Sequence, residues 1–148
     1  MTDTDASVTL VTEKQERNGY YDALDGRTKL IKKCIKQCDA EMIIKTIDGE
    51  YKAGVEIELT SKSFKRLVGA VQSIDANRED LNAVLWIALY GTIIKNLQSA
   101  IKAQLPHLRY PRRHLFILWN DFTSQQMAAT WTNVYGQKMK LFVNEEVL

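Results

Sequence analysis

Three glutamates, Glu41, Glu56 and Glu58, stand in two short apolar segments of this 148-residue chain. Carboxylates are poor strand formers and are costly to bury, so strands usually turn them toward water or a cation. Glu56 and Glu58 lie two residues apart and therefore share one face of a strand. If Glu41 reaches the same face, the three form an oxygen-rich site for Mg²⁺. Such a metal ion can activate water for phosphodiester hydrolysis.

A second interpretation of the same spacing requires no metal. Alternating glutamates are typical of the solvated face of an antiparallel hairpin. In that case Val55, Ile57 and Leu59 form the buried face of the strand. The two interpretations differ in which side of the strand is covered, and the spacing alone leaves both open.

Further polar residues extend the metal-site hypothesis. Lys62 or Lys65, from the start of the next helix, would supply positive charge near the carboxylates, and Gln72 would position water or backbone. Two basic clusters are candidates for contacting phosphates or stacking on bases. The candidate nucleic-acid-binding residues are Lys65, Arg66, Arg109, Tyr110, Arg112 and Arg113. Solvated faces and a charged loop are the alternative for both clusters.

Two cysteines and two histidines form the remaining candidate metal set, for zinc. Cys34 and Cys38 lie four apart, without the tight C-x-x-C loop, and both fall on an apolar helical stripe. We therefore favour buried core cysteines over zinc ligation together with His107 and His114. Absence of a secretory signal predicts a cytoplasmic location with reduced thiols.

The elements that must position these residues begin with a tail or short strand over residues 1–12, followed by one globular domain over 13–148. Apolar spacing predicts a helix over 27–38. Strands are expected over 41–47 and 51–60, with Asp48-Gly49 as the hairpin turn. Ser61 or Ser63 caps a helix that runs to about Ile74.

The apolar run over 81–91 fits either the start of one long helix to Leu105 or a buried strand followed by a new helix. We favour the strand, because Gly91-Thr92 resembles a stop and an N-cap. A second buried strand is expected over 114–119, a helix over 124–136, and an edge strand or extended tail over 138–143. This alternation predicts an α/β fold with a central mixed sheet flanked by helices.

The order of elements, with the residues that it carries, resembles the PD-(D/E)XK nuclease superfamily, also called the restriction-endonuclease-like fold. Segment 41–44 falls at the family's first acidic strand, and 54–58 falls at its acid-x-lysine strand. Segment 65–72 resembles the helix that follows, and 83–91 the next core strand. The chain departs from the pattern where Glu58 occupies the lysine position and Glu41 replaces the usual aspartate. A Glu-x-Glu variant occurs among restriction enzymes.

This resemblance implies a Mg²⁺-dependent nuclease acting on DNA, with Glu41 and Glu56 on the metal and Glu58 on the metal or the attacking water. It also allows an inactive relative that binds nucleic acid or protein. A third hypothesis, a small adaptor or inhibitor that binds a protein partner, suits the net charge of only +2. Hydrophobic content of 45% is ordinary for a globular domain. No apolar run approaches the length of a membrane span.

Overall fold

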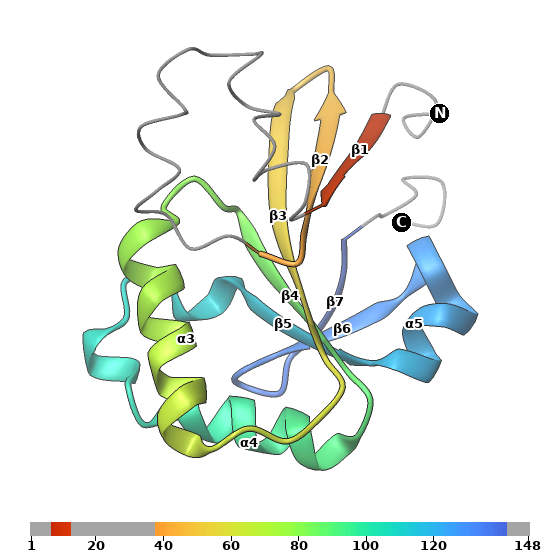
Figure 1. The fold of residues 1–148 in the computed structure, drawn as a ribbon. Helices are drawn as coiled ribbons and strands as arrows, with labels where there is room; N and C mark the ends of the chain where they lie inside the picture. Colours follow the sequence, from red (N-terminus) through yellow and green to blue (C-terminus); the bar gives the residue numbers. More distant parts are fainter. Residues whose placement is uncertain (1–6, 13–37, 142–148) are drawn as a thin grey trace.

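A mixed β-sheet forms the centre of the molecule in a computed structural model, which describes residues 7–12 and 38–141 (Figure 1). The sheet has seven strands in sequential order. These strands are β1 (Ser7–Thr12), β2 (Ala40–Thr46), β3 (Gly49–Glu58), β4 (Ala83–Ala88), β5 (His114–Leu118), β6 (Thr130–Asn133) and β7 (Lys138–Lys140). The predicted α/β architecture with a central mixed sheet is confirmed.

The first three strands form an antiparallel meander, and β3, β4 and β5 then run parallel. The last two strands are again antiparallel to their neighbours. Because parallel neighbours need crossovers, helix α3 (Phe64–Asn77) joins β3 to β4 and helix α4 (Gly91–Lys102) joins β4 to β5. These helices contact each other, so both cover the same face of the sheet.

Local sequence explains most of these boundaries. The β2–β3 hairpin turns at Ile47-Asp48, and Gly49 after them has φ +137°, a conformation that favours glycine. Ser63 caps α3 as expected, because its hydroxyl accepts a hydrogen bond from the Arg66 amide at 3.3 Å. The strand interpretation of 81–91 is confirmed, since β4 ends at Ala88 and α4 begins at Gly91.

One predicted helix is wrong. Residues 124–136 contain the end of α5 (Trp119–Gln125), the short 3₁₀ turn η5 (Gln126–Ala128) and strand β6. Gln126 adopts φ +49° and stops the helix. Thr130, Trp131 and Thr132, which have high strand propensity, then pair with β5 and β7.

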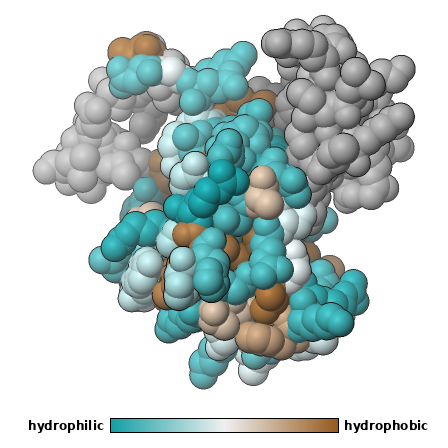
Figure 2. Space-filling view, turned by 90° about the vertical axis from the view of Figure 1, so that its left-hand side faces the viewer, coloured by the Kyte–Doolittle hydropathy of each residue, from teal (hydrophilic) through white to brown (hydrophobic). Residues whose placement is uncertain are grey.

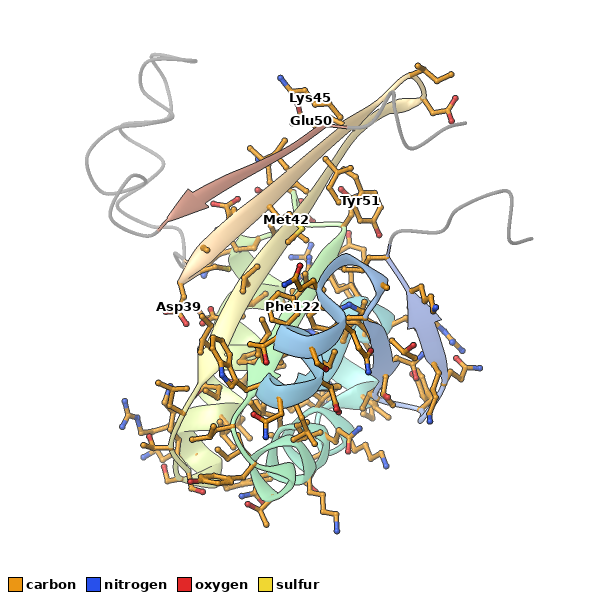
Figure 3. The ribbon with its side chains drawn as sticks, turned by 90° about the vertical axis from the view of Figure 1, so that its right-hand side faces the viewer. Asp39, Met42, Lys45, Glu50, Tyr51 and Phe122 are labelled. Carbon is orange, nitrogen blue, oxygen red and sulfur yellow. The ribbon has the colours of Figure 1, made fainter. Side chains whose placement is uncertain are left out.

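Two hydrophobic cores lie on opposite faces of the sheet. The core under α3 and α4 includes Leu67, Val71, Trp86, Leu97 and Phe116. The core on the other face includes Val55, Leu85, Ile117 and Trp131, and Phe122 of α5 packs against it. Figure 3 shows Met42, Tyr51 and Phe122 on this second face.

Two predictions concern the limits of the described chain. The helix predicted over 27–38, with Cys34, lies outside the described residues except for Cys38, which precedes β2. Residues 7–12 form a strand of the sheet, which confirms the short-strand alternative for this segment. In the described part of the chain, every helix is too short or too polar to cross a membrane.

Candidate functional site

The three candidate carboxylates share one face of the sheet. Glu41 lies directly opposite Gly54 in the antiparallel β2–β3 register, and Gly54, Glu56 and Glu58 alternate along the same side of β3. That side is the one covered by α3 and α4, and all three glutamates are buried there, Glu56 and Glu58 at 5% exposure.

The solvated-face interpretation of these glutamates is therefore wrong. Ile57 and Leu59, which it expected in the core, are exposed, although Val55 is buried as expected. Pairing with β4 determines which face the β3 side chains point to. Glu56 and Glu58 are level with Trp86 and Ala88 of β4, which lie on the helix-covered face. Burial of adjacent carboxylates is costly unless partners compensate it, so their partners decide what the site can do.

Glu41 and Glu58 share this face but do not meet. Glu58 lies four residues beyond Gly54, which corresponds to about 13 Å along the strand. The space over Gly54 is filled: a Cβ there would lie 2.6 Å from Cys38 Sγ and 2.9 Å from Leu81 Cδ1. Glu41 therefore lies at one end of the row, and Glu56 and Glu58 lie toward the C-terminal end of β3.

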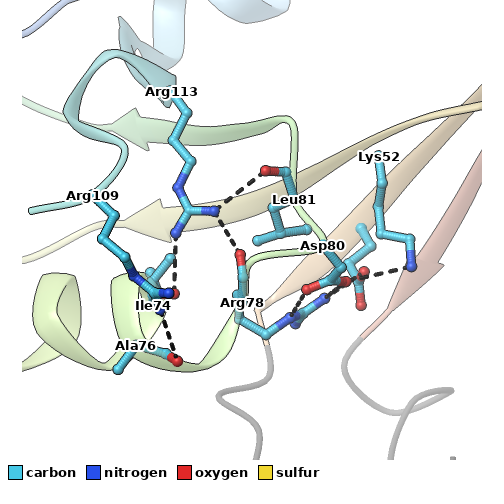
Figure 4. A network of polar contacts seen from close by, with 9 residues as sticks. Lys52, Ile74, Ala76, Arg78, Asp80, Leu81, Arg109 and Arg113 are labelled. Carbon is cyan, nitrogen blue, oxygen red and sulfur yellow. Dashed lines mark hydrogen bonds and ion pairs between the residues drawn. The ribbon is translucent and has the colours of Figure 1, made fainter.

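Glu41 is part of a buried ion-pair network with the residues that follow α3 (Figure 4). Arg78 Nη2 donates to Glu41 Oε1 at 2.8 Å, and Arg78 also binds Asp80 through Nε and Nη2, both at 2.9 Å. Lys52 Nζ approaches Asp80 Oδ2 at 3.4 Å. Glu41 Oε2 is buried and has no hydrogen-bond partner among the described residues. Two cations and two carboxylates thus compensate one another.

Burial and pairing shift the pKa values in this network. Burial raises the pKa of Glu41 above its ordinary value, although the Arg78 guanidinium opposes that shift. Burial alone would raise the pKa of Asp80, but hydrogen bonding and charge from Arg78 lower it. Burial opposes the charge of Arg78, yet hydrogen bonding to Asp80 and the charge of Glu41 raise its pKa. Arg78 therefore stays protonated and anchors Glu41.

Glu58 has a different partner, Lys62, in the loop before α3. Lys62 Nζ lies 3.0 Å from Glu58 Oε1 and 2.7 Å from Oε2. The Lys62 side chain is partly exposed, whereas the Glu58 carboxylate is buried. The predicted placement of a lysine ammonium beside the β3 carboxylates is thus present, with Lys62 as the residue that supplies it.

Asp39 is a candidate that the sequence pattern did not single out. Its Oδ2 accepts a hydrogen bond from the Ile57 backbone amide at 2.7 Å. Continuing the β2–β3 register by one residue places Asp39 beside Glu56. The available signal was an aspartate directly before an acid-bearing strand. Asp39 therefore lies beside Glu56 in the strand register at the C-terminal end of β3, where Glu58 pairs with Lys62.

The remaining α3 candidates lie outside this group. Lys65 and Arg66 are exposed on the first turn of α3, near Lys62 in the chain. Gln72 is exposed on the outer surface of α3, whereas Val71 beside it is buried under the helix. Gln72 therefore does not face the buried carboxylates.

The second basic cluster secures a loop. Arg113 is buried and donates to the backbone carbonyls of Ile74 and Leu81 at 3.1 and 3.3 Å (Figure 4). The Arg109 guanidinium binds Glu79 and the Asp75 carbonyl. These contacts fasten the loop before β5 to the end of α3, which is an ordinary role for arginine near helix carbonyls.

The rest of this cluster is also engaged. Arg112 binds Gln137 at 3.1 Å and lies 4.7 Å from the centre of the Tyr135 ring. Because Arg113 precedes the first residue of β5, the cluster is at the N-terminal edge of the parallel strands. Glu56 and Glu58 belong to the opposite edge, so the structure separates these two groups.

The cysteine–histidine hypothesis gains no geometric support. Cys38 is buried in the helix-side core, and His107 is exposed on a separate turn. His114 is fully buried and its Nδ1 accepts from Trp86 Nε1 at 3.0 Å. Burial, with the nearby Arg113 charge, lowers the pKa of His114 to about 3, so the ring is neutral at physiological pH. Among residues 7–12 and 38–141, no group of three or more His, Cys, Asp or Glu residues is placed to hold a metal ion.

The described geometry thus contains an ion-pair network around Glu41, and a smaller acidic group with Lys62 at the end of β3. Comparisons with protein-family models, with curated proteins and with solved structures found no match to this chain.

Proposed function

We propose that this protein acts on nucleic acid and hydrolyses phosphodiester bonds with Mg²⁺ held at the C-terminal end of β3. The observation that carries the proposal is the burial of Glu56 and Glu58 on one face, with the Lys62 ammonium 2.7 Å from Glu58. Two carboxylates on one face of a strand and a nearby, partly exposed lysine are the kinds of group that bind Mg²⁺ and a phosphate.

In this proposal Glu56 and Glu58 are the metal ligands that the chain itself offers, and Asp39 stands beside them. The metal would supply a water of lowered pKa and neutralise developing charge on the phosphate. Lys62 would exchange its contact with Glu58 for one with the phosphate when substrate and metal bind. Glu41 would have to leave Arg78 to reach the same ion, so we assign it a supporting role.

The order of elements supports the resemblance to the PD-(D/E)XK superfamily. An antiparallel meander carries the first acid on β2 and the Glu-x-Glu pair on β3, and a helix then leads to a parallel strand. We propose membership of this superfamily on that combination. The Glu58 side chain at the family's lysine position, with Lys62 four residues later, is the feature that distinguishes this chain.

A specific observation favours a second function, binding of nucleic acid or of a protein without chemistry. Glu41 and Glu58 each already have a cationic partner within 2.8 Å. A site whose carboxylates are neutralised by the protein itself resembles one that has lost its metal. This alternative keeps the fold and the surface but predicts no cleavage.

Cleavage assays with and without Mg²⁺ separate the two functions. We expect Mg²⁺-dependent cleavage of DNA by the wild type, lost in Glu56→Gln and Glu58→Gln while circular dichroism shows the fold intact. Glu50→Gln, an exposed glutamate at the hairpin end of β3, is the matched control and should cleave normally. Binding without cleavage by the wild type would support the second function instead.

A further inference from the structure

Exposed large hydrophobic side chains gather where the parallel strands end. Tyr90 follows β4 and is 60% exposed, and Trp119 follows β5 and is 37% exposed. Leu59, after β3, and Phe64, at the start of α3, are also exposed. We call Leu59, Tyr90 and Trp119, which follow the three parallel strands, the C-terminal-edge patch. Single exposed hydrophobic residues are common, but a group at one edge marks an interaction surface.

Strand register places this patch beside the proposed site. Glu58 of β3 is level with Ala88 of β4, which is level with Leu118 of β5. The segments that carry the patch therefore leave three neighbouring strands at one height, within about 10 Å across the sheet. These strand ends lie toward the lower right of Figure 1. Glu58 and its partner Lys62 belong to the same edge.

Charged residues of both signs lie around the patch, with the acids Asp39, Glu56 and Glu58 at the end of β3. Lys62, Lys65, Arg66 and Lys95 are at least partly exposed on the loop and helix turns that begin here. Asp121 is the exposed acid of α5 on this side. Figure 2 shows another side of the molecule, the α3 side, where small hydrophobic areas lie within a mainly hydrophilic surface. Because protein–protein interfaces are depleted in lysine, exposed Lys65 and Lys95 near these aromatic side chains favour an anionic partner with apolar faces.

We propose that the C-terminal-edge patch binds single-stranded nucleic acid, with bases stacking on Tyr90 and Trp119 and phosphates contacting Lys65 and Arg66. The inference rests on the proposed function and names its substrate class. Aromatic side chains reach base faces only when the bases are unstacked, whereas a duplex hides those faces. A strand held in this way would pass directly over Glu58 and Lys62.

Exposed tyrosines at the other edge are less suited to stacking. The Arg112 guanidinium lies 4.7 Å from the Tyr135 ring centre, and Arg113 and Arg109 lie 5.1 and 5.7 Å from that of Tyr110. Cation–π contacts of this kind already occupy ring faces. Tyr90 has no ring or cation contact of this kind among the described residues, which makes Tyr135 a matched control.

Intrinsic fluorescence gives a direct readout, because the chain has three tryptophans and Trp86 and Trp131 are buried at 1% and 2% exposure. We would titrate the full chain with oligothymidylate in EDTA, so that no hydrolysis contributes. Stacking on Trp119 should quench the emission, and Trp119→Phe should remove the quenching signal. Tyr90→Ala should weaken binding about tenfold, as expected for loss of one stacked base, and Tyr90→Phe should restore it.

Further variants test the polar half of the proposal. Replacing both Lys65 and Arg66 with glutamine removes two phosphate contacts. The slope of the logarithm of the binding constant against the logarithm of the salt concentration should then become shallower by about 1.4. Tyr135→Ala should bind as the wild type does. Equal weakening by Tyr135→Ala and Tyr90→Ala, or binding of a matched duplex as tight as the single strand, would overturn the proposal.

The outcomes also separate this inference from the proposed function. Oligothymidylate binding by a wild type that shows no Mg²⁺-dependent cleavage would support the patch and refute hydrolysis. Mg²⁺-dependent cleavage of duplex DNA, with no fluorescence quenching by single strands, would support hydrolysis and refute the single-strand patch. Absence of quenching by oligothymidylate overturns the single-strand proposal. This holds also if the patch is found to bind a protein instead.

Discussion

Removing Arg78 should destabilise the protein more than removing the charge of Glu41. Arg78→Met leaves Glu41 fully buried and removes the hydrogen bond to Oε1, beside an Oε2 that has no partner among residues 7–12 and 38–141. Breaking a buried pair in this way costs about 3–5 kcal/mol of unfolding free energy. Glu41→Gln removes the charge while Arg78 keeps both bonds to Asp80, so we expect about 1–3 kcal/mol.

Urea denaturation followed by tryptophan fluorescence measures both variants and the double mutant. Residues that contact one another in one network are energetically coupled. The double mutant should therefore lose less unfolding free energy than the two single mutants lose in sum. Arg66→Met, an exposed arginine of α3, is the control and should change stability by less than about 0.5 kcal/mol.

The pH dependence of the Arg78→Met variant provides a second check. A carboxyl whose folded pKa is raised binds more protons when folded, so its contribution to stability falls as pH rises through that folded pKa. Without Arg78 the pKa of Glu41 should rise further, and the variant should lose less stability at about pH 5 than at neutral pH. A larger loss for Glu41→Gln than for Arg78→Met would refute the network. So would a stabilised Glu41→Gln, because relief of carboxylate repulsion is the signature of a shared metal site.

Two further predictions test packing on the helix side of the sheet. Gly54→Ala should lower stability by about 1–3 kcal/mol, because its Cβ would overlap Cys38 Sγ and Leu81 Cδ1, and Cys38→Ala in the same chain should recover part of that loss in thermal melts. The His114 pKa of about 3 lies below the unfolded value of 6.5, so its stabilisation is complete above pH 6.5 and declines toward pH 3. Denaturation curves across that range should show a slope of up to about 1.4 kcal/mol per pH unit, and His114→Gln should reduce it while still accepting from Trp86. An unchanged slope in that variant would assign the effect to other groups.

Sequence reasoning succeeded where local signals agree with the tertiary structure. The hairpin near Asp48 and the Ser63 cap follow from single residues and are present, although the turn lies at Ile47-Asp48 rather than at the predicted Asp48-Gly49. The break before α4 is also present, but the helix begins at Gly91 with Tyr90, not Thr92, next to its N-terminus. The helix predicted over 124–136 is wrong, because apolar spacing does not reveal the left-handed conformation of Gln126 or the pairing of β6 with β5.

The candidate site was only partly predictable, because contacts between different helices and strands determine it. Alternation along β3 shows that Glu56 and Glu58 share a face, but only α3 and α4 determine that this face is covered. Pairing of Glu41 with Arg78 joins residues 37 positions apart, and no local pattern signals it. Asp39 became visible only through its bond to the Ile57 amide.

Thermal melting with and without Mg²⁺ tests the proposed metal site most directly. If Glu56 and Glu58 hold the ion, saturating Mg²⁺ should stabilise the wild type, by about 2.7 kcal/mol when its concentration is 100 times the Kd. The corresponding rise in melting temperature should disappear in the Glu56→Gln/Glu58→Gln double variant and persist in Glu50→Gln. An identical melting temperature for the wild type in EDTA and in Mg²⁺ would contradict the metal site.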